Sequence, residues 1–294
     1  MKILIADKFG EDLPDKLAKY GEVVSEDMSQ LKDADVLLVR SKTKPNKEFI
    51  DSAPNLKLII RGGVGIDNID TAYCKEKGIL VHNTPSASAI AVAELVIAQM
   101  LTIQRRIVEA HNSTNAGKWE KKSLKGAEIY KKTLGLIGIG RIATEVAARA
   151  KAFGMNVIAY DPYVKTHEIA ELTSLEEVLK GSDFISLHIP FTEETKDLIN
   201  KETLSLMKSN AVIINTARGK VINESDLAEA LKAGTIRYAA IDVYQKEPPE
   251  GSPLIGLDNI LVTPHLGAST GENLQRIGQL VEKLVGELSR GELS

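Results

Sequence analysis

The sequence is poor in cysteine, in aromatic side chains and in long apolar runs. Its single cysteine, Cys74, excludes an internal disulfide framework and a cysteine-based metal site, and we predict no metal site. No apolar run reaches the roughly 20 residues that a membrane helix needs. The net charge is only −3, so the chain offers no general attraction to nucleic acid or to an anionic membrane. We therefore expect a soluble globular protein with neither kind of partner.

The amino-terminal segment "MKILIADKFG" gives no sign of export. Its apolar run is too short for a signal peptide, and the acidic Asp7 follows at once. The segment is instead typical of a first β-strand. We therefore predict a cytoplasmic protein.

Short apolar runs alternate with helical patterns along nearly the whole chain, which is typical of parallel βαβ units. A first series predicts strands within residues 2–7, 22–26, 35–40, 56–63 and 78–83. A long helical stretch over residues 86–113 and a polar connector over 115–132 follow. A second series predicts six strands, within residues 133–140, 156–161, 183–190, 211–219, 238–244 and 259–265. The order predicts two α/β domains.

The last segment, residues 272–291, predicts a helix with one apolar face and no strand after it. The face consists of Leu274, Ile277, Leu280, Val281, Leu284, Val285 and Leu288. We expect this helix to pack back onto the first domain. The predicted first domain is therefore discontinuous, with residues 1–88 and 270–294, and the second domain spans residues 89–269.

A glycine turn opens the second series. Gly138, Gly140 and the small Ala143 fit the spacing G-x-G-x-x-G/A, in which a strand turns into a helix whose amino end faces a pyrophosphate. Asp161 ends the next predicted strand, where an acid binds the ribose hydroxyls of NAD and repels the extra phosphate of NADP. The pattern predicts a Rossmann domain that binds NAD. The plainer alternative is a glycine turn with a surface aspartate.

Polar residues that can take part in catalysis stand at the ends of the later predicted strands, where ligands bind in open α/β sheets. They include Arg218, Asp242, Glu247 and His265. A histidine can exchange the hydroxyl proton of a 2-hydroxy acid, and a carboxylate can orient it and stabilise its protonated form. An arginine can hold the substrate carboxylate. Each residue alone has an ordinary structural explanation, but together they favour hydride transfer between a 2-hydroxy acid and NAD.

These segments resemble the NAD-dependent D-isomer-specific 2-hydroxyacid dehydrogenases. The similar stretches include "GLIGIGRIATEVAARAKAFGMNVIAYDPY", "INTARGKVINESDLAEAL", "AAIDVYQKEPP" and "NILVTPHLGAST". The resemblance implies that Arg218 binds substrate, that His265 is the acid/base, and that Glu247 supports it. It implies a cofactor site lined by Gly138, Gly140, Arg141, Ile142, Asp161, His188, Ile189, Pro190, Thr195, Thr216, Ala217, Asp242, Gly267 and Ala268. The first domain would be a smaller, flavodoxin-like substrate domain.

The first domain is similar to that of family members that oxidise D-3-phosphoglycerate, the step that opens serine synthesis. Its similar stretches are "LLVRSKTK" and "LKLIIRGGVGIDNIDTAYCKEKGILVHNTP". Arg40, Ser41 and Lys42 supply the cations and hydroxyl that a phosphorylated 2-hydroxy acid needs. Gly63, Val64 and Gly65 resemble a loop whose N–H groups hold the substrate carboxylate, with His265 and Arg218 completing the substrate site.

Other functions stay open at this point. The same chemistry can act on an unphosphorylated acid, as in glyoxylate or hydroxypyruvate reduction, and Arg40 is the residue that distinguishes the two. A second alternative is an NAD-sensing binding protein of the same fold. Because the sequence stops about 29 residues after His265, we expect no appended regulatory domain. By resemblance, the long helix over residues 86–111 joins two subunits into a homodimer.

Overall fold

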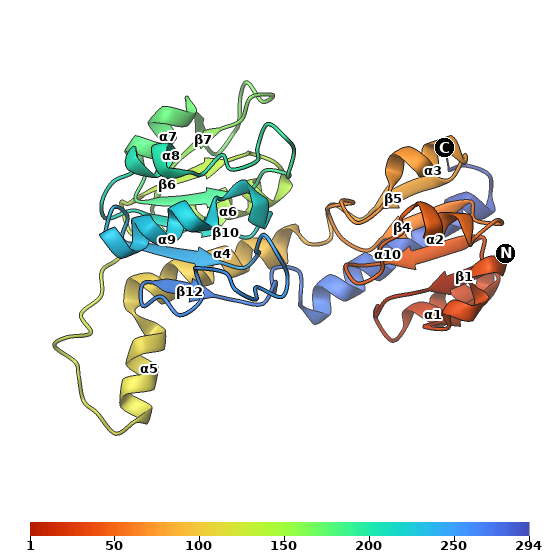
Figure 1. The fold of residues 1–294 in the computed structure, drawn as a ribbon, viewed down its shortest axis with the longest axis horizontal. Coiled ribbons are helices and arrows are strands. Elements are labelled where there is room, and N and C mark those ends of the chain that lie inside the picture. Colours follow the sequence, from red (N-terminus) through yellow and green to blue (C-terminus); the bar gives the residue numbers. More distant parts are fainter. Residues whose placement is uncertain (294) are drawn as a thin grey trace. The chain divides into compact units, whose positions relative to one another are not determined.

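The chain folds into two compact α/β units, shown as a ribbon in Figure 1. A computed structural model describes residues 1–293. One unit combines Met1–Ser88 with the chain from Ala268 onward, and the other is Ala89–Gly267. The chain therefore returns to the first unit after residue 267, two residues earlier than the predicted boundary after residue 269.

A five-stranded parallel sheet forms the centre of the first unit. Its strands are β1 (Lys2–Ile5), β2 (Glu22–Ser25), β3 (Val36–Val39), β4 (Leu58–Arg61) and β5 (Leu80–Asn83). Their order, β2-β1-β3-β4-β5, is that of flavodoxin-like folds. The apolar strands carry alternate side chains to opposite faces, so each face has its own buried core.

Helices cover both faces of this first sheet. One core packs against α1 (Leu13–Leu17) and α10 (Gly271–Ser289), and the other against α2 (Lys47–Asp51) and α3 (Thr71–Glu76). Short 3₁₀ turns, η1 (Ala18–Tyr20) and η2 (Met28–Asp33), connect the remaining strands. Ile277, Val281 and Val285 of α10 are buried against the strands, which confirms that the last helix packs on the first domain.

The second unit contains a seven-stranded parallel sheet. Its strands are β6 (Thr133–Ile137), β7 (Asn156–Tyr160), β8 (Glu171–Leu172), β9 (Phe184–Leu187), β10 (Val212–Asn215), β11 (Tyr238–Ile241) and β12 (Ile260–Val262). The order β12-β11-β10-β9-β6-β7-β8 runs outward in both directions from β6 and β9. This is the doubly wound Rossmann arrangement, with its switch point between β6 and β9.

The prediction of six strands was wrong by one, because β8 has only two residues and no apolar run. Helices α6 (Arg141–Ala152), α7 (Leu175–Gly181), α8 (Lys201–Ser205) and α9 (Glu224–Ala233), with the turn η3 (Gly219–Val221), connect the strands. The two faces of the sheet again carry separate buried cores. In the part of the chain that is described, no helix combines the length and apolarity needed to cross a membrane.

The predicted single helix over residues 86–113 is in fact two helices. The first, α4 (Ala89–Arg105), is buried along one side against α6. Arg106 then adopts a left-handed conformation, with φ of 53°, and the chain turns into α5 (Ile107–Asn115). At the break, Ala127 N of the connector donates a hydrogen bond of 3.0 Å to Gln104 O, and the Arg106 guanidinium donates one of 2.6 Å to Ser123 O.

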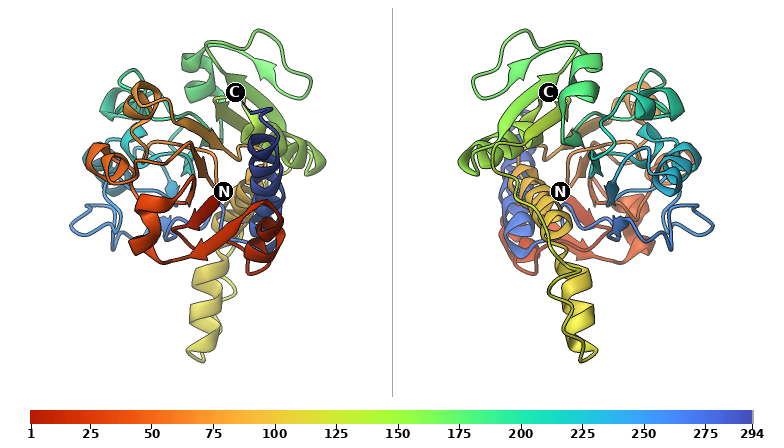
Figure 2. Two further views of the ribbon diagram at one scale, coloured as in Figure 1. Left: turned by 90° about the vertical axis from the view of Figure 1, so that its right-hand side faces the viewer. Right: turned by 90° about the vertical axis from the view of Figure 1, so that its left-hand side faces the viewer.

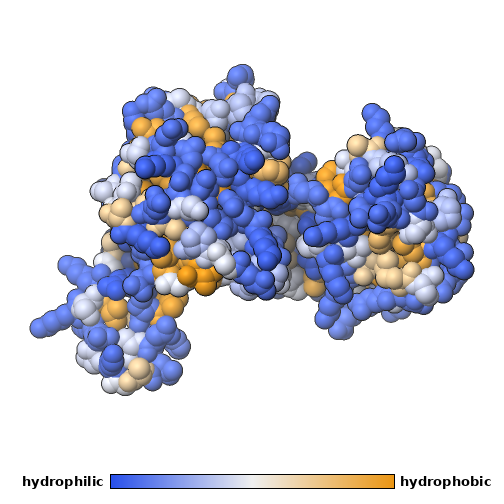
Figure 3. Space-filling view, in the orientation of Figure 1, coloured by the Kyte–Doolittle hydropathy of each residue, from blue (hydrophilic) through white to orange (hydrophobic). Residues whose placement is uncertain are grey.

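Helix α5 and the connector after it form a projecting arm, which we define as residues 107–130. Two views show the arm extending away from the rest of its unit (Figures 1 and 2). No residue of α5 is buried. Ile107, Val108, Trp119 and Tyr130 are among the most exposed large apolar side chains of the described chain. Apolar patches are visible between the charged side chains of the arm (Figure 3).

Candidate active site

The glycine turn lies at the switch point of the second sheet. Gly138 follows β6 with φ of +88°, and a Cβ there would stand 2.7 Å from His188 O, just beyond β9. Gly140 begins α6, and a Cβ there would meet no atom within 4 Å. Ala143 is fully buried against the sheet. The three positions thus provide a tight turn, open space beside the backbone and close helix packing, as the motif predicts.

Asp161 is bound to the same turn. Its Oδ2 accepts a hydrogen bond of 3.0 Å from Ile139 N, and its Oδ1 accepts one of 2.9 Å from Tyr163 N. The carboxylate therefore lies at the carboxyl end of β7, directly beside the glycine turn. No side chain caps the amino end of α6, so its first N–H groups lack a side-chain acceptor. Among the described residues, this helix end and Asp161 make a site that fits a dinucleotide.

The predicted cofactor residues after β9 lie on the other side of the switch point. His188 is half-buried, and its Nε2 is 2.9 Å from Ser186 Oγ. Burial lowers the pKa of His188 to about 3, so its imidazole is neutral at physiological pH. The chain continues through Ile189 and Pro190, and Thr195 Oγ1 donates a hydrogen bond of 2.8 Å to Pro190 O. Thr195 thus stabilises the loop that follows β9.

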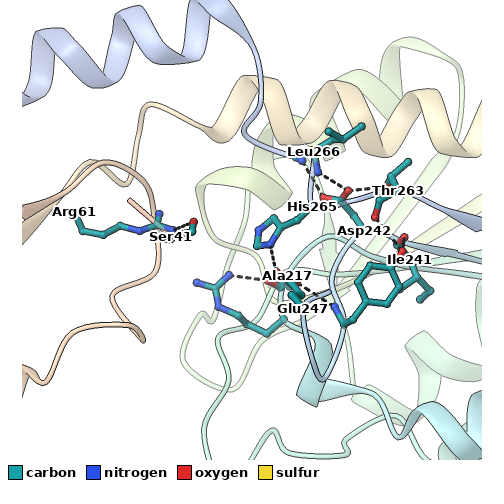
Figure 4. Close-up of polar contacts among 12 residues, drawn as sticks. Ser41, Arg61, Ala217, Ile241, Asp242, Glu247, Thr263, His265 and Leu266 are labelled. Carbon is teal, nitrogen blue, oxygen red and sulfur yellow. Dashed lines mark hydrogen bonds and ion pairs between the residues drawn. The ribbon is translucent and has the colours of Figure 1, made fainter. Parts of the chain in front are cut away.

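Strand β10 ends in a second turn that carries Thr216, Ala217 and Arg218. Asn215 holds this turn, because its Oδ1 accepts from Ala217 N at 3.0 Å and its Nδ2 donates to Arg218 O at 2.9 Å. The Arg218 Nη1 donates to Ala217 O at 2.7 Å (Figure 4). The hydroxyl of Thr216 is buried and has no hydrogen-bond partner among residues 1–293. A buried orphan hydroxyl at the ligand edge of the sheet fits the predicted role of Thr216 beside a cofactor.

His265 and Glu247 form a direct pair. The His265 Nδ1 and the Glu247 Oε2 are 2.8 Å apart, and the ring points toward the carboxylate in Figure 4. Glu247 Oε1 also accepts a hydrogen bond of 3.2 Å from Tyr244 N, which orients the carboxylate. Since a carboxylate only accepts, Nδ1 carries the proton and Nε2 is left for a substrate. The predicted placement of an acid behind the histidine is thus present in the geometry.

Asp242 positions the backbone of this histidine. The carboxylate is fully buried and accepts hydrogen bonds from Thr263 Oγ1 at 2.6 Å, Leu266 N at 2.7 Å and Gly267 N at 2.9 Å. Its own carbonyl accepts from His265 N at 2.9 Å. His265 has a left-handed backbone with φ of 55°, which costs free energy unless the surroundings impose it. Asp242 therefore supports the turn that presents the histidine.

The loop that carries Glu247 has a support that the sequence analysis missed. Glu224, at the start of α9, accepts hydrogen bonds from Gln245 N at 2.7 Å and from Ser252 Oγ at 2.6 Å. Gly219 permits the close packing, because a Cβ there would stand 1.9 Å from the carbonyl carbon of Tyr244. The segment after Arg218 therefore packs against the segment that leads to Glu247. An acid on a helix gave no sequence signal of this role.

The predicted phosphate-binding residues lie in the first unit, at the carboxyl ends of its strands. Arg40 follows β3 and is half-buried, while Ser41 and Lys42 are exposed. Arg61 at the end of β4 was not among the predicted residues, yet its Nη2 donates to Ser41 Oγ at 3.3 Å (Figure 4). Its position at a strand end, directly before the predicted glycine loop, was the available signal. The first unit thus places two guanidinium groups at one edge of its sheet.

The Gly63–Gly65 loop follows β4 at the same edge. The Gly63 N–H already donates to Arg61 O at 2.9 Å, so Val64 and Gly65 supply the remaining N–H donors of the loop. Val64 O accepts a hydrogen bond from Asn83 Nδ2, which holds the loop against the end of β5.

Comparison with known proteins agrees with this geometry. Residues 97–267 match the family model described as "D-isomer specific 2-hydroxyacid dehydrogenase, NAD binding domain". The chain belongs to the D-isomer-specific 2-hydroxyacid dehydrogenase family. Within that family, residues 97–267 are the NAD-binding domain, and the two-sheet architecture predicted from the sequence is confirmed.

Members of the family with different names are similar to this chain. A D-3-phosphoglycerate dehydrogenase from Methanocaldococcus jannaschii is 48% identical over 100% of the chain and 58% of the relative. A hydroxypyruvate reductase from Thermotoga maritima is 50% identical over 89% of the chain and 87% of the relative. The solved D-lactate dehydrogenase from Aquifex aeolicus, in complex with NAD and lactic acid, is 34% identical, with a TM-score of 0.88 over 99% of the chain and 96% of that structure.

The lengths of these relatives differ in an important way. The chain spans 58% of the length of the Methanocaldococcus jannaschii phosphoglycerate dehydrogenase. It spans 87% of the Thermotoga maritima reductase. Similarity alone therefore does not choose between the phosphorylated and the unphosphorylated substrate.

Proposed function

We propose that this protein oxidises D-3-phosphoglycerate to 3-phosphohydroxypyruvate with NAD, the step that leads from this intermediate toward serine. The observation that carries the proposal is the His265–Glu247 pair, with 2.8 Å between Nδ1 and Oε2. It stands in a chain whose residues 97–267 are an NAD-binding domain. The 48% identity to a D-3-phosphoglycerate dehydrogenase supports the choice of substrate.

The proposed mechanism gives separate roles to His265, Glu247 and Arg218, which we call the catalytic trio. His265 takes the C2 hydroxyl proton on Nε2 while Nδ1–H stays hydrogen-bonded to Glu247. The carboxylate of Glu247 stabilises the positive charge that the ring then carries. Arg218 holds the substrate carboxylate with its guanidinium and orients C2. Bound NAD would supply the hydride acceptor, so that C2 loses a hydride, its hydroxyl oxygen loses a proton to His265, and the two atoms become a carbonyl group.

The proposed cofactor contacts follow from the turn geometry. The first N–H groups of α6, at Arg141 and Ile142, receive the pyrophosphate, and Asp161 accepts from the ribose hydroxyls. The proposal keeps the predicted lining at Gly138, Gly140, His188, Ile189, Pro190, Thr195, Thr216, Ala217, Asp242, Gly267 and Ala268. Asp242 acts there through its backbone and the turn it supports, because its carboxylate is fully buried.

The substrate phosphate is assigned to the first unit. Arg40 supplies a guanidinium whose Nε is buried without an acceptor in the described chain, and whose Nη1 makes one long hydrogen bond of 3.5 Å to Lys8 O. Its donors are therefore poorly satisfied, as expected for a residue that meets an anion. Ser41 and Arg61 stand beside it at the strand ends. Lys42 adds positive charge to the same loop.

A second candidate function is reduction of hydroxypyruvate or glyoxylate. The 50% identity to a hydroxypyruvate reductase over 87% of that relative favours it. The catalytic trio serves both reactions. The two candidates differ in what they require of Arg40, since only a phosphorylated substrate brings a second anionic group.

We also propose that two copies of the chain associate through the arm. Ile107 is 52% exposed, Trp119 83% and Tyr130 58%, and no residue of α5 is buried. Exposed apolar side chains on a projecting segment are typical of a surface that a second copy covers.

The first experiment compares substrates directly. NADH formation is followed with D-3-phosphoglycerate at alkaline pH in the presence of hydrazine, which traps the keto product, beside NADPH formation and a panel of unphosphorylated 2-hydroxy acids. Turnover of the phosphorylated acid with NAD supports the proposal. Turnover confined to unphosphorylated acids moves the function to the reductase, and NADH binding without turnover of any acid moves it to an NAD-sensing protein.

Two variants make the experiment specific to the site. Glu247→Gln keeps a hydrogen-bond acceptor for the histidine but removes the charge, and should lower kcat by about 100-fold. The matched control is Glu250→Gln, which changes an exposed acid of the same loop that pairs with Lys246 and should leave kcat unchanged. Arg40→Gln should raise KM for the phosphorylated acid by about tenfold and leave an unphosphorylated acid nearly unchanged. Equal effects on both acids would remove Arg40 from the phosphate site.

A further inference from the structure

A buried acid stands behind the loop that carries Arg40, and no reaction step uses it. Asp7 follows β1 and is only 5% exposed. Its Oδ2 accepts hydrogen bonds from Arg40 N at 2.5 Å and from Thr43 N at 3.2 Å. Its Oδ1 accepts one of 2.7 Å from the Thr43 hydroxyl. A buried carboxylate is expensive unless its charge is satisfied, and here the loop itself satisfies it.

The opposite side of the same loop is held by an amide. Asn68 Nδ2 donates to Arg40 O and to Thr43 O, both at 2.8 Å. Asp7 therefore binds the N–H groups of residues 40 and 43, while Asn68 binds their carbonyl groups. Both ends of the loop are fixed by side chains from other segments, and neither contact comes from the regular hydrogen bonding of the sheet.

We propose that Asp7 and Asn68 are positioning residues that preform the loop of residues 40–43 for the anionic group of the substrate. The inference rests on the proposed function, because it assigns the phosphate to this loop. The hydrogen bonds agree with it, since Asp7 binds the N–H of Arg40 itself and Asn68 binds its carbonyl group. Holding a loop in its bound shape lowers the entropy that ligand binding would otherwise cost.

Preorganisation predicts a selective defect. Without the hydrogen bonds of Asp7 and Asn68, the loop has more conformations, and the phosphorylated acid must order it on binding. The defect should therefore appear in the affinity for the phosphorylated acid. Reduction of hydroxypyruvate, which has no phosphate, does not need the loop of residues 40–43 and should keep its KM and kcat. A purely structural role in folding would instead lower activity on both substrates alike.

The test uses Asp7→Asn, which keeps the shape of the side chain but loses its charge and one acceptor oxygen. Its matched control is Asp35→Asn, an acid in the same unit just before β3. Asp35 likewise accepts a backbone N–H, from Lys2 at 2.8 Å, but stands at the opposite edge of the sheet. Thr43→Val removes the hydroxyl that donates to Asp7, and Thr43→Ser restores it.

Binding of D-3-phosphoglycerate in the presence of NADH is measured by calorimetry, and hydroxypyruvate reduction is measured by absorbance. We expect Asp7→Asn and Thr43→Val to weaken binding about tenfold, with Thr43→Ser and Asp35→Asn near wild type and hydroxypyruvate kinetics within about twofold. Equal loss on both substrates, or no loss in Asp7→Asn, overturns the inference. A wild-type protein that reduces hydroxypyruvate but does not bind the phosphorylated acid overturns the proposed substrate, and the inference with it.

Discussion

At the residue scale, His188 shows how burial controls charge beside the glycine turn. Its backbone carbonyl lies beside Gly138, and its Nε2 is 2.9 Å from Ser186 Oγ. Burial lowers its pKa from an ordinary value of 6.5 to about 3. The ring therefore stays neutral through the whole range in which the enzyme is expected to work, and it adds no positive charge to the cofactor site.

This shift makes folding stability depend on pH. Between pH 6.5 and about 3 the unfolded chain binds a proton at this residue and the folded chain does not. The contribution of neutral His188 to the free energy of unfolding is therefore present above pH 6.5 and is lost as pH falls through that window. His188→Gln should therefore reduce the slope of the free energy of unfolding against pH below pH 6.5, by at most about 1.4 kcal/mol per pH unit. Urea unfolding at several pH values measures it.

The control for this prediction is His111→Gln, which changes an exposed histidine of α5. It should leave the pH profile of the wild type in place. If His188→Gln and the wild type lose stability in parallel between pH 6 and pH 4, His188 does not contribute as a neutral buried group.

At the element scale, the loop after β7 is tied to helix α6 by a chain of hydrogen bonds. The His167 Nδ1 accepts from Ile169 N at 3.3 Å and from Ala170 N at 3.1 Å. The proton therefore lies on Nε2, which is 3.1 Å from Thr144 Oγ1, and that hydroxyl donates to Gly140 O at 3.1 Å. The chain of contacts ends on the carbonyl of the second glycine of the motif.

This connection should help to hold the cofactor site together. Thr144→Val removes the hydroxyl and breaks the link, and should weaken NADH binding about fivefold, because the loop after Asp161 must then be ordered on binding. Thr144→Ser keeps the hydroxyl and should bind like the wild type. Fluorescence titration with NADH measures both, and an equal affinity in the valine variant would show that the link has no part in cofactor binding.

The sequence predicted the elements with regular periodicity better than those set by single contacts. Buried strands such as β3 and β10 consist wholly of buried residues and were recognisable from their apolar runs. The two-residue β8 gave no such run. The break between α4 and α5 arises at Arg106, in a stretch that contains neither glycine nor proline. The contacts at this break are made with the connector, as between Arg106 and Ser123, 17 residues away, and no local pattern contains them.

The same distinction holds for the candidate site. The glycine motif and the polar residues at strand ends follow from sheet geometry, so Gly138, Asp161 and His265 were predictable. Supporting residues were not, because their partners are distant in sequence. Glu224 holds a backbone N–H 21 residues away, and Asp7 holds one 33 residues away. Their roles are visible only once the chain is folded.

At the scale of the whole molecule, the arm is a part of the chain that exposes large apolar side chains away from the sheets. Trp119 is 83% exposed and Tyr130 is 58% exposed, an unusual arrangement for large aromatic side chains in a chain with only 4% aromatic residues. Ile107 and Val108, at the start of α5, are 52% and 45% exposed. Leaving this surface in water forgoes burial worth roughly 25 cal/mol per Å². A second copy of the chain is the occupant we propose.

Charge placed on this surface should separate the copies. The double substitution Ile107→Glu with Val108→Glu puts two carboxylates where the apolar contact is proposed, and should convert a dimer into a monomer in sedimentation velocity at micromolar concentration. Leu206→Glu, at the end of α8 in the same unit, is the control with a comparable exposed apolar side chain and should remain dimeric. Because the substituted residues are exposed in the single chain, folding should be little affected, and circular dichroism checks this. A wild-type monomer, or a double variant that remains dimeric, would show that the arm does not join two copies.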